Sequence, residues 1–316
     1  MRAKIMLLSG SAQDEINASY AEKILLDISA AFDHTFSLRQ EAIGEKSVTA
    51  HGEALTDETI LACQQCQAVF VCDAGAQGIQ DLYDALNLPL LIRSFTVPEV
   101  LCGRHEAPIC LYVGSVFSLD EDTLRQAARS AFSFSQELDV RLCHVSPAGA
   151  SKAEWEAAVR VQEASFPQVS AAAVTAPEAI RAMISAPERM GLLLCPPYAG
   201  SIMLSAGTAL CTHPSVIHDM TFDSSIGVYA PYLPRDGFEP GPFAAALAVA
   251  KMLRCSLRLS KEAACLEAAL SNVIVSGWRA KEEDGGGAIT GEGVVELLCE
   301  QIAVAGELMN KGGILG

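Results

Sequence analysis

The stretch Met190 to Leu210, MGLLLCPPYAGSIMLSAGTAL, decides the fold that the sequence predicts. Its apolar run from Met190 to Cys195 stops at Pro196-Pro197, and a short apolar run bounded by prolines is typical of a buried strand. The residues from Ala199 to Leu210 are mostly small and apolar, which predicts a helix that packs closely against its neighbour. Ligands of open α/β sheets bind beyond the carboxyl ends of the strands. The junction at Tyr198 to Ser201 is therefore the expected site, although the whole stretch contains no carboxylate.

Short apolar runs alternate with amphipathic helical patterns on both sides of this stretch. Such alternation is typical of an α/β protein with a doubly wound, mainly parallel sheet. Residues 211–242 look irregular, and the C-terminal part predicts three helices, at 243–257, 261–276 and 291–309. The expected strands lie at 4–8, 36–40, 68–72, 109–116, 140–145, 168–174 and 190–195, with a further extended segment that starts at 88–92. The expected helices lie at 14–32, 55–66, 77–86, 119–138, 151–165, 176–184 and 199–210.

The composition excludes several classes of partner. Half of the residues are hydrophobic and 19% are charged, which is typical of a folded globular chain. The net charge of -16, from 22 basic and 38 acidic residues, repels phosphate backbones and anionic lipid, so we expect no nucleic-acid and no membrane partner. The sequence has neither a signal-peptide core nor the roughly 18 uncharged apolar residues of a membrane span. We therefore expect a cytoplasmic protein.

The cysteines support the same location. There are eleven, scattered through apolar segments, which predicts buried and reduced thiols. Cys63 and Cys66 form a CxxC motif that lacks a second pair and a nearby basic residue. A metal or redox role for this pair is the less favoured interpretation.

Two stretches resemble the isocitrate/isopropylmalate dehydrogenase family. HGEALTDETILAC, from His51 to Cys63, is similar to the "GEPLPEETLEAC" segment of 3-isopropylmalate dehydrogenases, and the run from Phe243 to Trp278, which includes MLRCSL and EAA, is similar to a C-terminal run of the same family. The resemblance implies an isopropylmalate-dehydrogenase-like two-domain fold with a discontinuous first domain, formed by residues 1–90 and 213–316, and a second domain of residues 91–212. It also implies a homodimer held by apolar helices near Ala176 to Ile184 and Ser201 to Leu210.

The family oxidises and decarboxylates 2-hydroxy acids with NAD(P) and Mg²⁺ or Mn²⁺, and this chemistry depends on carboxylates at the metal and a catalytic lysine. The resemblance places Ser201 and Ser205 where two metal aspartates of a "FGDILSDEA" segment belong, and Thr175 near a third. Val145, in His144-Val145-Ser146-Pro147, stands where the lysine belongs. The sequence therefore predicts no catalytic residue and no metal site of the family type.

The cofactor segments also differ from the family pattern. The adenine loop is matched by Ala230 to Pro242 without its His and Gly-Ser, and the N-terminal glycine loop is reduced to Gly10 to Glu15. We therefore expect no cofactor, and the cofactor-binding residues are unknown. NAD and Mg²⁺ or Mn²⁺ would be required if the chain were instead an active dehydrogenase with a rearranged site.

Four residues remain as candidates for binding a small anionic substrate. Arg93 matches the substrate arginine of "NLRPV", Tyr112 matches the tyrosine of "IYFG", Arg104 lies near a second arginine position, and Ser201 occupies the helix start. For Arg93 the structural alternative is a salt bridge or a surface position, and for Arg104 and Tyr112 a purely structural role is the favoured interpretation. Two other sites stay open as minor alternatives, a hydrolase-like elbow at Gly200-Ser201 and a transition-metal site formed by Cys211, His213 and His218.

The sequence thus favours a family member that has lost metal-dependent oxidative decarboxylation and acts as a small-anion-binding or regulatory pseudoenzyme. The alternative is an active NAD(P)-dependent 3-isopropylmalate or 2-hydroxy-acid dehydrogenase. A third hypothesis is a regulatory subunit that associates with a catalytic paralogue.

Overall fold

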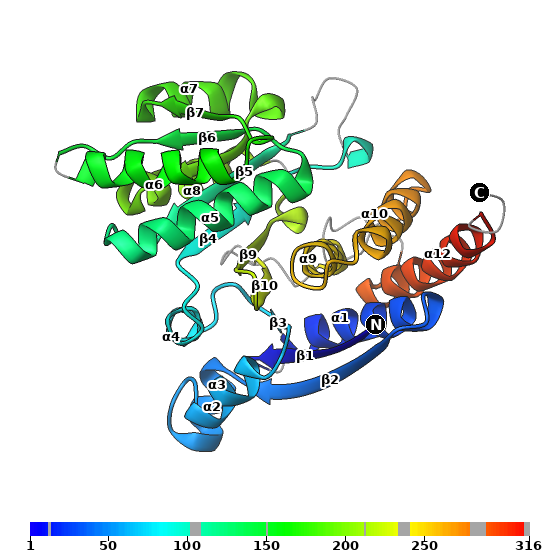
Figure 1. The fold of residues 1–316 in the computed structure, drawn as a ribbon. Coiled ribbons are helices and arrows are strands. Elements are labelled where there is room, and N and C mark those ends of the chain that lie inside the picture. Colours follow the sequence, from blue (N-terminus) through cyan, green and yellow to red (C-terminus); the bar gives the residue numbers. More distant parts are fainter. Residues whose placement is uncertain are drawn as a thin grey trace. The chain divides into compact units, whose positions relative to one another are not determined.

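The computed structural model is an α/β protein whose contacts divide the chain into two units (Figure 1). The first unit is formed by Met1–Leu86 with Ser224–Gly316, and the second by Asn87–Asp223. The structure describes residues 1–11, 14–101, 109–149, 151–211, 213–232, 241–278 and 289–312.

The first unit contains a parallel sheet with the strand order β2-β1-β3-β10. These strands are β1 (Arg2–Ser9), β2 (Thr35–Ala42), β3 (Ala68–Val71) and β10 (Gly227–Pro231). Ile5 of β1 is in register with Leu38 on one side and with Ala68 on the other. Strands β3 and β10 are buried along their whole length, as the apolar runs of parallel sheets usually are.

Helices cover this sheet, and the buried helix α9 (Pro242–Cys255) lies at the centre of their packing. Every residue of α9 except Arg254 is buried, and its many alanines allow α1 (Asp14–Ala31), α10 (Ser260–Val275) and α12 (Gly291–Gly312) to pack closely around it. The remaining helices of the described part of this unit are α2 (Gly44–His51), α3 (Asp57–Gln64) and α4 (Ile79–Ala85).

The second unit has the strand order β9-β4-β5-β8-β6-β7. Its strands are β4 (Leu90–Ser94), β5 (Leu111–Val116), β6 (Leu142–Val145), β7 (Ala171–Val174), β8 (Gly191–Cys195) and β9 (His218–Phe222). Strand β4 is antiparallel to both β9 and β5, whereas β5, β8, β6 and β7 are parallel. Its helices are α5 (Glu121–Leu138), α6 (Ser151–Ser165), α7 (Ala176–Ser185) and α8 (Pro197–Leu210), with the 3-10 turns η1 (Glu99–Leu101), η2 (Pro187–Arg189) and η3 (Pro214–Val216).

The fold class predicted from the sequence is confirmed, because most strand pairs are parallel and helices alternate with them. Two local expectations are wrong. Residues 211–242 are not simply irregular, since they include β9 and β10, and residues 44–51 form α2, which the sequence pattern did not predict. No helix in the described ranges is long and apolar enough to cross a membrane.

The second boundary of the domains also differs from the expected position. The first unit resumes at Ser224, whereas the sequence placed the return at residue 213. The reason is the pairing of β9 with β4, which makes His218 to Phe222 part of the second unit.

Candidate functional site

The junction singled out by the sequence is the turn from β8 into α8. Strand β8 is fully buried, Pro196 is the N-cap residue of α8, and Pro197 occupies the first turn, where a missing N–H costs nothing. Two glycines bring α8 onto its support, because a Cβ at Gly200 would overlap the hydroxyl of Ser115 and one at Gly207 would lie 2.5 Å from the ring of Phe95. The sequence interpretation of small residues as a close packing face is therefore correct for these two positions.

The two serines of α8 lie on its solvent side. Ser201 is exposed, and its hydroxyl donates to the carbonyl oxygen of Pro197 at 3.1 Å. The hydroxyl of Ser205 donates in the same way to the carbonyl of Ser201 at 2.9 Å. Both hydroxyls are thus engaged with the helix backbone, and neither carries a charge. The first turn of α8 contains no acidic residue.

Arg93 is held by a carboxylate on the neighbouring strand. It lies in β4 directly opposite Asp219 of β9. Its Nε and Nη2 atoms donate to Oδ1 and Oδ2 of Asp219 at 2.6 and 2.7 Å, and the two side chains are 12% and 2% exposed. This two-pronged geometry satisfies both carboxylate oxygens. The candidate substrate arginine is therefore already paired with an anion of the chain itself.

Tyr112 is a core residue of the second unit. Its side chain, in β5, is 4% exposed and meets the edge of the Phe134 ring at a centroid distance of 4.9 Å. This contact accounts for the residue without a ligand. Arg104, the remaining candidate, lies outside the described residues.

Two further positions at which the family has functional residues have structural roles here. Thr175 caps α7 in a reciprocal capping box, in which its hydroxyl accepts from the backbone of Glu178 and its backbone N–H donates to the Glu178 carboxylate at 2.8 Å. Val145 is buried at the end of β6. The neighbouring His144 accepts a hydrogen bond from the indole of Trp155 at 3.1 Å, and its burial lowers the pKa of the imidazole.

These residues do not fit Mg²⁺ or Mn²⁺. Hard divalent cations take carboxylate and carbonyl oxygens, whereas α8 offers two neutral hydroxyls that already donate to the helix backbone. In the part of the chain that the structure describes, no three His, Cys, Asp or Glu side chains come together as a metal site. The transition-metal alternative at Cys211, His213 and His218 is therefore not supported, and Cys211 instead donates to the His213 carbonyl at 3.4 Å.

The start of the shortened glycine loop also fits a dinucleotide poorly. A pocket of about 500 Å³ beside Gly10 is lined by the carboxylates of Glu15 and Glu45, and the ammonium of Lys46 lies 2.6 Å from Glu15. Two carboxylates and one already paired cation disfavour a pyrophosphate. Residues 12–13 and 233–240, which include parts of the two cofactor segments, lie outside the described residues.

The CxxC pair is buried. Cys63 is fully inaccessible and Cys66 is 8% exposed, and burial raises the pKa of the Cys63 thiol to about 12. Thiolates are the reactive and metal-binding form of cysteine, so this environment favours the structural interpretation of the pair.

Two features were missed by the sequence analysis. Asp219 is not among the sequence-based candidates, and its position across from Arg93 became visible only with the strand pairing of β9. A polar pocket between α5 and α6 was not anticipated, because residues far apart in the sequence line it.

Relatives and solved structures that resemble this chain include several dehydrogenases. No protein-family model matches the chain. The 3-isopropylmalate dehydrogenase of Nitratidesulfovibrio vulgaris is 22% identical across 96% of this chain and 100% of the relative, and that of Thermotoga maritima is 23% identical across 95% and 99%. Among solved structures, isocitrate dehydrogenase from Methylococcus capsulatus superimposes with a TM-score of 0.76 at 15% identity, covering 95% of this chain and 99% of that chain. A beta-decarboxylating dehydrogenase from Thermococcus kodakarensis superimposes with a TM-score of 0.77 at 15% identity, and the match covers 95% of this chain and 96% of that chain. The sequence similarity and the shared fold thus extend over nearly the whole chain.

Proposed function

We propose that this chain, a member of the isocitrate/isopropylmalate dehydrogenase family, has lost metal-dependent oxidative decarboxylation and acts by binding a small anion or a regulatory partner. The observation that carries the proposal is the ligand set of α8. Ser201 and Ser205, at the positions where the family resemblance places metal aspartates, present neutral hydroxyls that donate to backbone carbonyls. Anionic ligands hold a divalent cation in place, and the bound cation in turn stabilises the negative charge of a decarboxylation intermediate. Without such ligands, neither interaction is available.

The ion pair of Arg93 supports the same proposal. An arginine that binds a substrate carboxylate must have its N–H groups available for that carboxylate. Here Nε and Nη2 of Arg93 both donate to Asp219, so a substrate carboxylate could take this edge of the guanidinium only by displacing a buried anion of the chain. This exchange is unfavourable because the displaced Asp219 carboxylate would be left buried without its partner.

The alternative is an active NAD(P)-dependent dehydrogenase with Mg²⁺ or Mn²⁺ at a rearranged site. Thermal unfolding with Mn²⁺, NAD, NADP, isopropylmalate and isocitrate, singly and in combination, separates the two. A ligand present at 100 times its dissociation constant stabilises the folded state by about 2.7 kcal/mol. We expect no shift of the unfolding midpoint with metal and cofactor together and no reduction of NAD. A shift that requires both, accompanied by turnover, contradicts the proposal.

A matched variant tests the role of the two serines. Ser201→Asp with Ser205→Asp places two carboxylates one turn apart on the exposed side of α8. We expect Mn²⁺ to bind the double variant more tightly than the wild type, measured by the loss of the free Mn²⁺ electron paramagnetic resonance signal. Equal and tight Mn²⁺ binding by both proteins would show that the cation uses other ligands.

We also propose a homodimer. Ile184 of α7 and Tyr198 and Ile202 of α8 are 64%, 83% and 41% exposed, which leaves large apolar side chains on two neighbouring helices in contact with water. Ile202→Glu is expected to shift the chain towards monomer in sedimentation equilibrium. Leu26→Glu, at a 49% exposed position of α1, is the matched control and should leave the association unchanged. A regulatory complex with a catalytic paralogue would instead give a hetero-oligomer when both proteins are co-expressed.

The proposal places the protein in the cytoplasm. Every cysteine that the structure describes has a free thiol, and most of these thiols are buried. Free thiols in such number are typical of a reducing compartment. The net charge of -16 argues against nucleic acid and anionic membranes as partners.

A further inference from the structure

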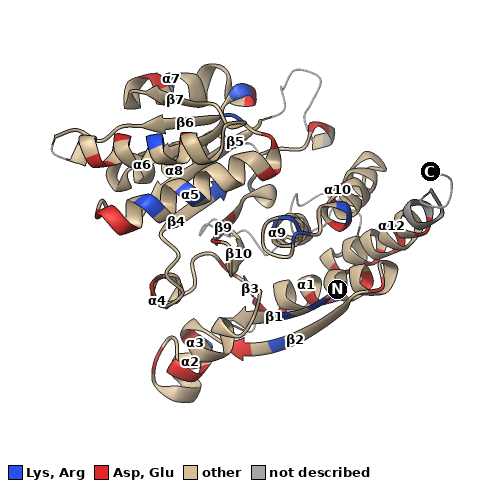
Figure 2. Cartoon of the chain, viewed as in Figure 1, with Lys and Arg blue, Asp and Glu red and all other residues tan. Residues whose placement is uncertain are grey.

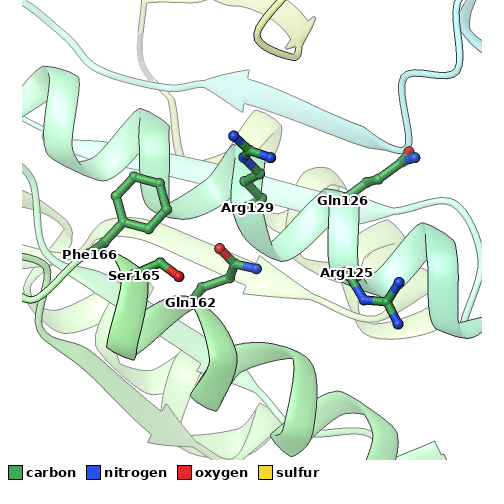
Figure 3. Close-up of a pocket in the computed structure, with 6 residues that line it drawn as sticks. All are labelled: Arg125, Gln126, Arg129, Gln162, Ser165 and Phe166. Carbon is green, nitrogen blue, oxygen red and sulfur yellow. The ribbon is translucent and has the colours of Figure 1, made fainter.

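A pocket of about 470 Å³ opens between helices α5 and α6 of the second unit (Figure 3). Its lining side chains are Arg125, Gln126, Arg129, Gln162, Ser165 and Phe166. The first three project from α5 and the others from α6 and its C-terminal end. The volume lies in the range of small-molecule sites. None of the lining residues is a carboxylate, in a chain that carries 38 of them.

Gln162 is the buried polar group of this pocket. Its side chain extends from α6 into the space between the two helices, and the residue is 5% exposed. No hydrogen bond joins its amide to any residue that the structure describes, although the amide has two N–H donors and an acceptor oxygen. Neither amide atom is among the fully buried, unpartnered polar atoms of the described residues, so both remain accessible to water or a ligand in the pocket.

Arg129 contributes a positive charge to the lining of the pocket. Its guanidinium makes no ion pair or hydrogen bond with the described part of the chain, whereas Arg125, one turn earlier, is bound to Glu121 at 2.7 Å and to Asp122 at 3.3 Å. Figure 2 shows blue segments on α5 in a chain in which acidic residues are more numerous. The unpaired cation and the unpaired amide therefore line the same pocket.

Phe166 gives the pocket an apolar wall. Its ring lies 5.9 Å from that of Phe132, which is fully buried, and this contact holds the ring at the end of α6. The hydroxyl of Ser165 donates to the carbonyl of Val161 at 3.1 Å and so has no proton for a ligand. Among the donors that line the pocket, the guanidinium of Arg129 and the NH₂ group of Gln162 have no partner in the described part of the chain, and the exposed amide of Gln126 lies on the α5 side.

We propose that the α5/α6 pocket binds a small organic oxyanion whose negative group is held by Arg129 and Gln162 and whose flat apolar part lies against Phe166. A guanidinium and an amide that line the same pocket can both supply N–H donors to a phosphate or carboxylate. This inference goes beyond the proposed function and does not rest on it, because the pocket is separate from α8 and β4 and would exist in an active enzyme as well.

Isothermal titration calorimetry with phenyl phosphate tests the site, since this probe combines a dianion with an aromatic ring. We expect phenyl phosphate to bind more tightly than inorganic phosphate, because only the ester reaches Phe166. Benzoate, in a parallel titration, distinguishes a carboxylate source from a phosphate source. Arg129→Gln should weaken binding of the preferred probe about tenfold or more, as a charge-assisted hydrogen bond contributes more than a neutral one.

Matched variants decide the outcome. Arg160→Gln removes the same charge from an exposed position of α6 that does not line the pocket, and it should leave the affinity within about twofold. Gln162→Leu removes the amide while keeping an apolar side chain that suits a buried position, and it should weaken binding as well. The proposal is overturned if neither probe binds at millimolar concentration, or if Arg129→Gln and Arg160→Gln reduce affinity equally, which would mean that only the overall charge matters.

Discussion

Arg93 and Asp219 face each other across the antiparallel strands β4 and β9 and are joined by two hydrogen bonds of 2.6 and 2.7 Å. The pair explains why a strand that contains His218, Asp219 and Thr221 can be buried in a sheet, since the carboxylate has a cationic partner in register. It also occupies the Nε–Nη2 edge of the arginine that the sequence analysis placed in the expected substrate site. One pair thus bears on both the fold and the proposed loss of activity.

The first prediction is that Asp219→Asn destabilises the protein by about 3 kcal/mol, because it leaves the mostly buried guanidinium without its counter-charge. Arg93→Met combined with Asp219→Leu should recover most of this loss, since an apolar pair avoids the desolvation of two charges. Urea unfolding of the wild type, Arg93→Met, Asp219→Leu and the double variant measures the coupling as a double-mutant cycle. Additive effects would mean that the two side chains do not stabilise each other.

A second prediction concerns Gly191, at the start of β8. Its φ of +65° is in the left-handed region, and a Cβ there would overlap the backbone carbonyl of Arg141. Gly191→Ala is therefore expected to destabilise the chain by about 2–4 kcal/mol, the sum of the conformational cost and of the backbone shift.

Gly52 is the matched control for this substitution. Its φ is +87°, but nothing lies within 4 Å of the position that a Cβ would occupy. Gly52→Ala should cost about 1 kcal/mol, the conformational part alone. Chemical denaturation of both variants gives the comparison, and similar losses at the two positions would mean that the close approach to Arg141 carries no energetic weight.

Much of the fold could be predicted because local signals agree with the global arrangement. Helices α3 and α5 lie within the ranges 55–66 and 119–138 that the sequence pattern predicts, and their N-cap residues Thr56 and Asp120 each accept a hydrogen bond from the backbone three residues later. Helix α6 begins and ends where the pattern predicted, at Ser151 and Ser165. The missed strand β9 has three polar residues among five, so it lacks the apolar run by which buried strands are recognised.

The site could be predicted only in part. Sequence position alone indicated that Ser201 lies at the start of a helix, but not that its hydroxyl donates to the carbonyl of Pro197. The partner of Arg93 comes from a residue more than a hundred positions away, and the α5/α6 pocket depends on how two helices pack. The pairing of Arg93 and the packing of α5 against α6 depend on tertiary contacts, which cannot be predicted from the periodicity of the sequence.

The third prediction tests whether Thr175 is a helix cap or a remnant of a metal site. Thr175→Ala removes the side-chain half of the capping box of α7 and should cost about 1 kcal/mol. Thr175→Asp retains a good N-cap acceptor, so the free energy of unfolding should stay within about 0.5 kcal/mol of the wild type. Urea unfolding of the two variants checks this order. A large loss in both would show that the threonine methyl group or another contact matters more than the cap.

The last prediction concerns the buried pair of His144 and Trp155. The indole Nε1 donates to His144 Nδ1 at 3.1 Å, which requires that nitrogen to be unprotonated. Burial lowers the pKa of His144 below its ordinary value of 6.5, and the carboxylates of Glu163 and Glu156 oppose the shift only in part. The unfolded chain therefore takes up a proton at this histidine before the folded chain does. Stability from this group is fully present above about pH 6.5 and is lost as the pH falls towards the lowered pKa.

Replacement of the histidine isolates this contribution from the other histidines of the chain. The difference in unfolding free energy between the wild type and His144→Phe should be constant at neutral and higher pH and should shift against the wild type as the pH falls below about 6.5. Trp155→Phe removes the indole donor without adding charge and should retain the pH dependence while lowering stability at all pH values. Urea unfolding of the three proteins between about pH 8 and pH 5 measures both effects. A wild-type advantage that does not change with pH would mean that His144 has the same pKa in the folded and unfolded chain, and that its burial has no influence on its protonation.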